Sequence, residues 1–159
     1  MSEKDTVTDV KKINGVLDKC ETIHLGLRDG DRVYVVPVHY GYEENNGQYT
    51  FYFHGRPLGR RYDLLKKTHY AGFEIDSGQE FKPASDNIAC NFSASYSSVI
   101  GEGKVELIND REEKIKAFKP FMKQYTGRTD FEFPAKSTDY VQVYKLTVTD
   151  MCCRIHKAE

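Results

Sequence analysis

Two tight turns constrain what this chain can fold into more than any other feature. Asp29-Gly30 separates "ETIHLGL" from "RVYVVPVHYGY", and a second turn within "ENNGQ" leads into "YTFYFHG". Asp-Gly and Asn-Gly favour the left-handed turns that connect antiparallel strands, and the flanking segments are rich in apolar, β-branched and aromatic residues. The sequence therefore predicts a sheet built largely from hairpins.

Three segments have features of helices. A helix ending near Cys20 is predicted by apolar residues at helical spacing, namely Val7, Val10, Ile13, Val16 and Leu17. The segment "RRYDLLKKT" is expected to form a short helix. A longer helix is expected after Asp110, whose side chain can accept the N–H groups of the first turn, with Ile115, Phe118 and Met122 on one face.

The remaining segments are read as strands and one loop. "YAGFEID" is expected to be a strand, and residues 77–89 a loop, because Gly78 and Pro83 interrupt a polar stretch. "CNFSASYSSVIGEGKVELIND" predicts a long strand with a bend or bulge at Gly101 and Gly103. "YVQVYKLTVTDMCCRIHKA" predicts a long final strand.

About six strands joined mainly by hairpins, with about three helices, favour a mainly β fold. We expect a closed antiparallel six-stranded β-barrel with peripheral helices. At 159 residues the chain fits a single domain, residues 1–159. Eleven Tyr and nine Phe exceed what a core of this size needs. This aromatic content indicates a buried dimer face or a flat ligand.

Charge and composition argue against several classes of partner. Lys+Arg number 23 and Asp+Glu 24, so the net charge of −1 provides no global field for nucleic acid or anionic lipid. No apolar run reaches the ~18 residues of a membrane span, and "MSEKDTVTDVKK" lacks the apolar stretch of a signal peptide. We expect a cytoplasmic protein. The four cysteines form no C-x-x-C pair, which predicts reduced thiols and no metal site.

The clearest candidate site is the segment "FYFHGRPLGRR". His54, Arg60 and Arg61 supply hydrogen-bond donors, Gly55 and Gly59 allow close approach of the backbone, and no acidic residue balances the charge. Guanidinium groups, free N–H groups and the positive end of a helix are the means by which proteins hold phosphate. A solvated basic turn would have the same composition, so both interpretations stay open.

Two other segments have features that binding or packing could explain. Pro37 cannot donate a hydrogen bond to a sheet, so it predicts an edge strand or a bulge, whose freed backbone groups could bind a flat ligand or simply remain at the edge. Ser97 and Ser98 could bind a ligand or fit a crowded corner. The sequence contains no nucleophile elbow, P-loop or dinucleotide fingerprint. We therefore expect no self-sufficient hydrolytic or kinase site.

Taken together, "YVVPVHYGY", "FYFHGRPLGRRYDLLKK" and "YSSVIGEGKVELINDREEKIKAF" resemble a known family. In order and spacing they are similar to the pyridoxamine 5′-phosphate oxidase-like superfamily of FMN-binding split barrels, and within it to the nitroimidazole-resistance proteins. The resemblance covers residues 17–146. It implies a split β-barrel, FMN as cofactor, and a homodimer with the flavin at the subunit interface.

The resemblance also assigns roles to individual residues. It places Val36, Pro37, Val38, His39 and Tyr40 along the flavin ring, Phe53, His54, Gly55, Gly59, Arg60 and Arg61 around the phosphate, and Ser97 and Ser98 at the border of the flavin. Arg61 stands where the family often has lysine, which keeps the charge and improves the geometry for phosphate. Ser97 stands where the family often has arginine, which removes a basic group.

The function implied is that of an FMN-dependent oxidoreductase. Its acceptor would be small and flat, such as a nitroaromatic or a quinone, and His39 and His54 are the candidate proton donors because imidazole titrates near neutral pH. Three alternatives stay open. The chain could bind haem or flavin without turnover, with its five histidines as potential haem ligands; it could act as a pyridoxamine 5′-phosphate oxidase; or it could be a non-catalytic interaction protein.

Overall fold

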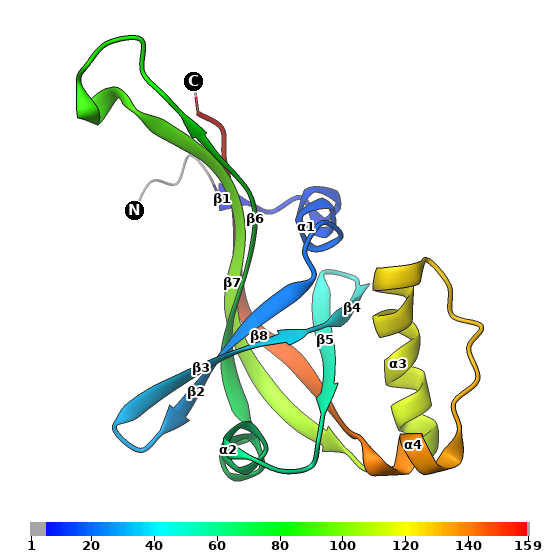
Figure 1. Ribbon diagram of the computed structural model, residues 1–159. Coiled ribbons are helices and arrows are strands. Elements are labelled where there is room, and N and C mark those ends of the chain that lie inside the picture. The colour runs from blue at the N-terminus through cyan, green and yellow to red at the C-terminus, as the bar shows by residue number, and fades with distance from the viewer. Residues whose placement is uncertain (1–5, 159) are drawn as a thin grey trace.

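The structure, a computed structural model, describes residues 6–158. Within them the chain forms an eight-stranded antiparallel sheet, four α-helices and one 3-10 turn (Figure 1). In chain order the elements are β1 (Thr6–Val7), α1 (Val10–Leu17), β2 (Thr22–Asp29), β3 (Arg32–His39), β4 (Gly41–Asn45), β5 (Gln48–Gly55), α2 (Arg60–Thr68), β6 (Tyr70–Lys82), η2 (Ala89–Asn91), β7 (Ser93–Ile108), α3 (Arg111–Thr126), α4 (Ala135–Tyr140) and β8 (Gln142–His156).

The sheet is strongly curved but does not close. Its strand order is β3-β2-β6-β7-β8-β5-β4, with β1 added beside β8. The two edge strands, β3 and β4, are separated in sequence only by Tyr40, yet they do not pair. The prediction of a mainly β antiparallel fold is confirmed. The predicted closed six-stranded barrel with about three helices is wrong in closure, in the number of strands and in the number of helices.

The sheet is open between β3 and β4, where the backbone of Tyr40 bonds to helix α3 instead of to a neighbouring strand. Pro37 lies in β3, which is an edge strand as predicted. Its nitrogen carries no hydrogen, so it cannot donate a hydrogen bond to a neighbouring strand. At Tyr40 the backbone N–H donates to Tyr125 Oη of α3 at 3.0 Å, and the carbonyl accepts from the same hydroxyl at 3.0 Å. Because α3 takes these groups, the chain turns away from β3 before β4 begins.

The structure differs from the sequence prediction at β1, at the start of α1 and at α4. Val7, predicted to lie in the first helix, belongs to β1, and α1 begins only at Val10. Asp9 caps this helix by accepting the N–H of Lys12 at 2.9 Å. Asp110 caps α3 as predicted, accepting from Glu113 N–H at 3.0 Å. The short helix α4 was not predicted because its sequence, "AKSTDY", has no apolar period.

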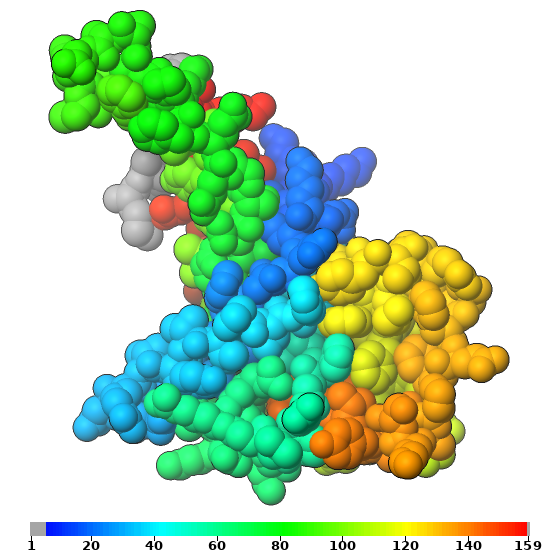
Figure 2. Space-filling view, in the orientation of Figure 1, coloured from blue at the N-terminus to red at the C-terminus, as the bar shows by residue number. Residues whose placement is uncertain are grey.

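The first part of the predicted 77–89 loop, residues 77–82, is strand. β6 continues to Lys82 and pairs with β7, and the register shifts between Ser77 and Glu80. Gly78 adopts a positive φ of 68° at this irregularity, so a glycine that resembles a strand breaker is accommodated in a bulge. The β6–β7 hairpin projects from the body as an arm (Figures 1 and 2). A register shift between β7 and β8 at Glu102/Gly103 confirms the predicted irregularity there.

The core fills the concave side of the sheet. Its largest fully buried side chains are Tyr40, Tyr144, Phe51, Phe53, Leu17, Ile23, Leu25, Leu27, Leu65, Ile75, Leu146 and Val99. The vicinal pair Cys152 and Cys153 points to opposite faces of β8, one thiol exposed and the other buried, and both are free. In the described part of the chain no helix has the length and apolar character needed to cross a membrane. The first five residues of the polar opening segment lie outside the described residues.

Candidate functional site

The predicted phosphate-binding loop joins the end of β5 to the start of α2. Gly59 precedes the helix with a φ of 92°, and no side chain caps it. Asp63 N–H donates to the Gly59 carbonyl at 3.0 Å, which leaves the N–H groups of the first three helical residues without an intrahelical acceptor. Three backbone donors and the positive end of the helix macrodipole therefore lie at this loop.

Arg61 is a half-buried cation that has no balancing anion among the described residues. Its Cζ lies 5.9 Å from the ring centroid of Tyr144. A Cβ atom on Gly55 would lie 1.7 Å from Arg61 Nη2, so the glycine leaves room for the guanidinium. Among residues 6–158 no carboxylate forms an ion pair with Arg61. Its buried Nε atom has no hydrogen-bond partner there either.

Tyr144 of β8 lies beside this guanidinium. Its ring is buried and stacks on Phe53 with 5.0 Å between centroids. The hydroxyl is close to Arg61 but outside hydrogen-bonding geometry, and it has no other partner in the described residues. Burial raises the pKa of Tyr144, and the charge of Arg61 opposes that rise. Sequence reasoning missed Tyr144, because its place opposite Phe53 depends on the β5–β8 register.

His54 lies on the other side of β5 from Phe53, since successive strand residues alternate in direction. Its ring packs against Phe118 at 5.3 Å and Phe121 at 4.7 Å, both on α3. Nδ1 is buried and has no hydrogen-bond partner in the part of the chain that the structure describes. Burial lowers the pKa of His54, and the nearby charges of Arg61 and His39 lower it further. The imidazole is therefore neutral at pH 7.

Arg60 has a different environment from Arg61. Its Nε and Nη2 donate to Asp29 Oδ2 at 3.0 and 2.6 Å, and its Cζ lies 4.5 Å from the Tyr34 ring centroid. This side chain ties α2 to the β2–β3 hairpin. Of the two arginines predicted to hold phosphate, only Arg61 is without an acidic partner.

The predicted ring-lining segment lies along edge strand β3, which contacts β5, the strand that leads into the loop. Pro37 and His39 are exposed, Val36 is half-buried, and Val38 and Tyr40 are buried. His39 Nδ1 lies 3.0 Å from the carbonyl oxygen of Glu21. Because a carbonyl can only accept, Nδ1 carries the hydrogen, and Nε2 is the ring nitrogen left for contact with a ligand.

A family model described as pyridoxamine 5′-phosphate oxidase matches residues 9–155. The chain belongs to this family. A search of curated proteins found no match. Membership fits the split-barrel-like sheet, the edge strand with its proline, and the basic loop before α2.

Solved structures related to this family member share its fold. A protein assigned to 5-nitroimidazole antibiotic resistance from Bacteroides thetaiotaomicron matches with a TM-score of 0.79 and 26% identity, covering 94% of this chain and 86% of that one. A flavocytochrome from Azotobacter vinelandii matches with a TM-score of 0.78 and 20% identity over 99% and 72% of the two chains. An FAD- and haem-binding protein from Mycobacterium smegmatis has a TM-score of 0.81 and 15% identity, with coverage of 96% and 74%.

Two predicted residues of this pyridoxamine 5′-phosphate oxidase family member, Ser97 and Ser98, lie far from the basic loop along β8. Gly55 pairs with Gln142 at the start of β8, whereas Ser97 pairs with Ile155 near its end. At about 3.3 Å per residue, the two positions are separated by about 40 Å along β8. Ser97 and Ser98 therefore do not share a site with the basic loop within one chain.

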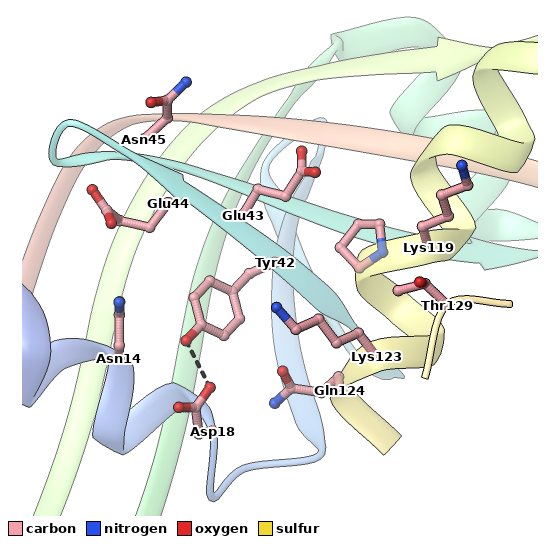
Figure 3. A pocket seen from close by; sticks show the side chains of 11 residues that line it. Asn14, Asp18, Tyr42, Glu43, Glu44, Asn45, Lys119, Lys123, Gln124 and Thr129 are labelled. Carbon is pink, nitrogen blue, oxygen red and sulfur yellow. Dashed lines mark hydrogen bonds between the residues drawn. The ribbon is translucent and has the colours of Figure 1, made fainter. Parts of the chain in front are cut away.

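A polar cleft of about 700 Å³ lies elsewhere, between the β4–β5 hairpin, α1 and α3 (Figure 3). Tyr42 Oη donates to Asp18 Oδ1 at 2.7 Å, and Lys123 extends from α3 toward this pair. Burial, together with Asp18, raises the pKa of Tyr42. None of the sequence-predicted site residues lines this cleft. Its carboxylates and lysines are mixed, so it lacks the uncompensated positive charge of the Arg61 end.

Proposed function

We propose that this chain is an FMN-binding oxidoreductase that reduces a small, flat acceptor of the nitroaromatic or quinone class. The observation that carries the proposal is the set of unsatisfied donors at the start of α2. Within residues 6–158, Arg61 has no acidic partner, its Nε is buried and unbonded, and three backbone N–H groups at the helix end have no intrahelical acceptor. A dianionic phosphate supplies both the charge and the acceptor oxygens that these groups lack.

The other residues of the site have roles that follow from their placement. Arg61 and the first N–H groups of α2 would hold the phosphate, and the exposed edge of β3 around Pro37 would support the flat ring. Arg60 would act indirectly, because its contact with Asp29 fixes the start of α2. Bound FMN supplies the electron-transfer chemistry, and the protein holds it and shapes the space beside it.

Between the two candidate proton donors, the geometry favours His39. The ring of His54 is wedged between aromatic side chains, and its lowered pKa keeps it neutral. His39 is exposed and has Nε2 available while Nδ1 is held by Glu21. We assign His39 to give a proton to the reduced acceptor and His54 to support the loop.

No cysteine is placed to act as a nucleophile in this site. Cys20 and Cys153 are buried, and burial raises the pKa of both, that of Cys153 to about 11. Cys152 is exposed on β8, where its register partner is Ile100 of β7. Electron transfer to the acceptor should therefore survive replacement of all four cysteines.

A homodimer is part of the proposal, because one chain cannot unite the predicted residues. Ser97 and Ser98 lie about 40 Å along β8 from the loop, so they can border the flavin only if a second chain supplies them. The exposed apolar residues Val33, Val35 and Ile100, with exposed fractions of 75%, 60% and 51%, offer surface for such a contact. Light scattering should give twice the 18.3 kDa chain mass, and a monomer with flavin bound would contradict the shared site.

The decisive test compares FMN with riboflavin, which lacks the phosphate. Each hydrogen bond to a charged group is worth roughly 1.5–3 kcal/mol, so FMN should bind at least about tenfold more tightly. Fluorescence quenching of each flavin measures the two dissociation constants. Equal dissociation constants for FMN and riboflavin would contradict the assignment of a phosphate site.

The absorption spectrum of the purified protein separates the proposal from its alternatives. Flavin bands support the proposal, whereas an intense Soret band would identify a haem protein. Reduction of a nitroaromatic by the chemically reduced protein tests turnover, and bound flavin without such reduction would indicate a carrier. The likeness to the Bacteroides nitroimidazole-resistance protein supports the choice of this acceptor class.

A further inference from the structure

A cluster of one histidine and two carboxylates lies on the outer face of the sheet, apart from the Arg61 site. His24 of β2 and Glu74 of β6 are direct partners across the two strands, and Asp76 lies two residues farther along β6. Residues two apart on a strand point to the same face, so all three side chains share one side of the sheet. One ligand atom from each lies within 4.8 Å of the others.

The distances suit a first-row divalent cation. His24 Nδ1 and Glu74 Oε2 are 3.2 Å apart. In a tetrahedral zinc site with bonds of about 2.0–2.2 Å, neighbouring ligand atoms lie about 3.3–3.6 Å apart. Two of the three ligands are therefore already near their coordinating separation, and the third, from Asp76, lies within 4.8 Å of both.

The charge of the cluster also favours a cation. Within residues 6–158 neither Glu74 nor Asp76 forms an ion pair with lysine or arginine, and His24 is the only basic partner of Glu74. Gln79 Nε2 donates to Asp76 Oδ2, which orients this carboxylate without neutralising it. Two adjacent carboxylates with one imidazole leave up to two negative charges for a divalent ion to balance.

We propose that His24, Glu74 and Asp76 bind one divalent transition-metal ion, with Zn²⁺ as the preferred ion and water in the remaining position. An imidazole with two carboxylates suits Zn²⁺ or Mn²⁺ better than Mg²⁺, which prefers oxygen ligands only. The sequence predicted no metal site because His24 lies 50 positions before Glu74 and no short motif joins the three residues. Only the pairing of β2 with β6 brings them together.

The test measures Zn²⁺ affinity by competition with a chromophoric chelator, using untagged full-length protein. Exposed thiols also bind zinc, so the parent carries Cys90→Ser and Cys152→Ser, the two exposed cysteines. The variant adds His24→Gln, Glu74→Gln and Asp76→Asn. We expect one Zn²⁺ per chain in the parent and at least a tenfold weaker affinity in the variant. Equal affinity and stoichiometry in the two proteins would overturn the proposal.

A matched control uses two carboxylates that face each other without a histidine. Glu102 and Asp150 are exposed and paired across β7 and β8. Glu102→Gln with Asp150→Asn should leave zinc binding unchanged, and an equal loss there would show that only diffuse negative charge attracts the ion. Mg²⁺ binding as tight as that of Zn²⁺ would overturn the role of His24.

A stability measurement guards against a variant that fails to fold. A ligand that binds only the folded chain raises Tm, and Zn²⁺ at 100 times its dissociation constant should raise Tm by roughly 5–10 °C. The rise should be present in the parent and absent in the variant, while circular dichroism shows both folded without metal. A rise of the same size in both proteins would refute the site.

Discussion

Two junctions between the sheet and its helices differ in whether their buried polar groups have hydrogen-bond partners. Where β3 meets α3, Tyr40 Oη donates to the Leu17 carbonyl at 2.8 Å, and Tyr125 Oη bonds the Tyr40 backbone and the Glu21 carbonyl. Where β5 meets α2, Arg61 Nε and Tyr144 Oη are buried without partners among the described residues.

The difference separates a structural junction from a binding site. Leaving a buried polar group unpaired costs about 1–3 kcal/mol, so folded proteins satisfy nearly all such groups. The Tyr40 junction follows that rule, and its hydroxyl groups fix where β3 ends. The Arg61 junction departs from it, which is expected where a ligand supplies the missing acceptors. The five predictions that follow test this contrast.

The largest effect is expected from Arg61→Met. Removing the guanidinium eliminates about two charge-assisted hydrogen bonds to phosphate, so FMN affinity should fall about 100-fold, equivalent to about 2.7 kcal/mol. The free energy of unfolding of the flavin-free protein should change by less than about 0.5 kcal/mol, because Arg61 loses no ion pair with a carboxylate of the described residues. Fluorescence titration and urea unfolding measure the two quantities. A strongly destabilised protein would make Arg61 a structural residue.

Tyr125→Phe should have the opposite profile. It removes the acceptor of the Tyr40 N–H and the donor shared by two carbonyls. The free energy of unfolding should fall by about 1–3 kcal/mol. The loss of FMN affinity should be smaller than for Arg61→Met. A stability equal to that of the wild type would show that water replaces the hydroxyl and that this junction does not hold β3 in place.

Gly55→Ala tests whether Arg61 needs its present position. The added Cβ would meet Arg61 Nη2 at 1.7 Å, and the flexible side chain should swing away while the backbone stays. We expect FMN affinity to fall about tenfold, equivalent to about 1.4 kcal/mol, with little loss of stability. Gly15→Ala is the control, since nothing lies within 4 Å of its Cβ position. Unchanged FMN binding in Gly55→Ala would separate the phosphate site from this arginine position.

Two tyrosine-to-phenylalanine changes compare the junctions directly. Tyr40→Phe removes the hydrogen bond from Tyr40 Oη to the Leu17 carbonyl. The free energy of unfolding should fall by about 1 kcal/mol. Tyr144→Phe removes a buried hydroxyl without a partner, so stability should stay the same or increase slightly. Both are measured by urea unfolding of the flavin-free protein. A larger loss from Tyr144→Phe than from Tyr40→Phe would reverse the contrast.

The smallest effect concerns pH. The pKa of His54 is lower in the folded than in the unfolded chain, chiefly because of burial, so the unfolded chain takes up the proton first as pH falls. Unfolding free energy should therefore decrease as pH drops below about 6.5, toward the lower folded-state pKa. His54→Gln should show a smaller decrease between pH 7.5 and 5.5. Parallel pH profiles for the two proteins would mean that His54 titrates as freely as in the unfolded chain.

Local patterns in the sequence predicted much of the fold and the family. The Asp-Gly and Asn-Gly turns, the period-two strands and the Asp110 cap are short-range signals, and they correctly indicated hairpins, antiparallel strands and α3. Pro37 correctly indicated an edge strand. These predictions hold because turn geometry and helix capping depend on residues only a few positions apart.

The extent of β6, the pairing of the arginines and the position of Ser97 depend on residues distant in the chain. Local sequence patterns predicted these features wrongly or did not distinguish them. Residues 77–82 continue β6 because β7 pairs with them, although Gly78 resembles a loop residue. Arg60 and Arg61 look alike in sequence. The β2–β3 hairpin brings Asp29 to Arg60 and leaves Arg61 unpaired. Likewise the sequence assigned both Gly55 and Ser97 to the flavin site, but Gly55 pairs with the start of β8 and Ser97 pairs near its end.

The sequence by itself determined the antiparallel hairpins, the family and the position of a basic loop before a helix. Only the tertiary structure decided that the sheet stays open, because Tyr125 of α3 takes the backbone groups of Tyr40 that a neighbouring strand would need. It likewise decided which arginine is uncompensated and that His24 meets Glu74. Strand register and charge pairing are set by contacts between residues tens of positions apart. Patterns within a short stretch of sequence therefore cannot predict them.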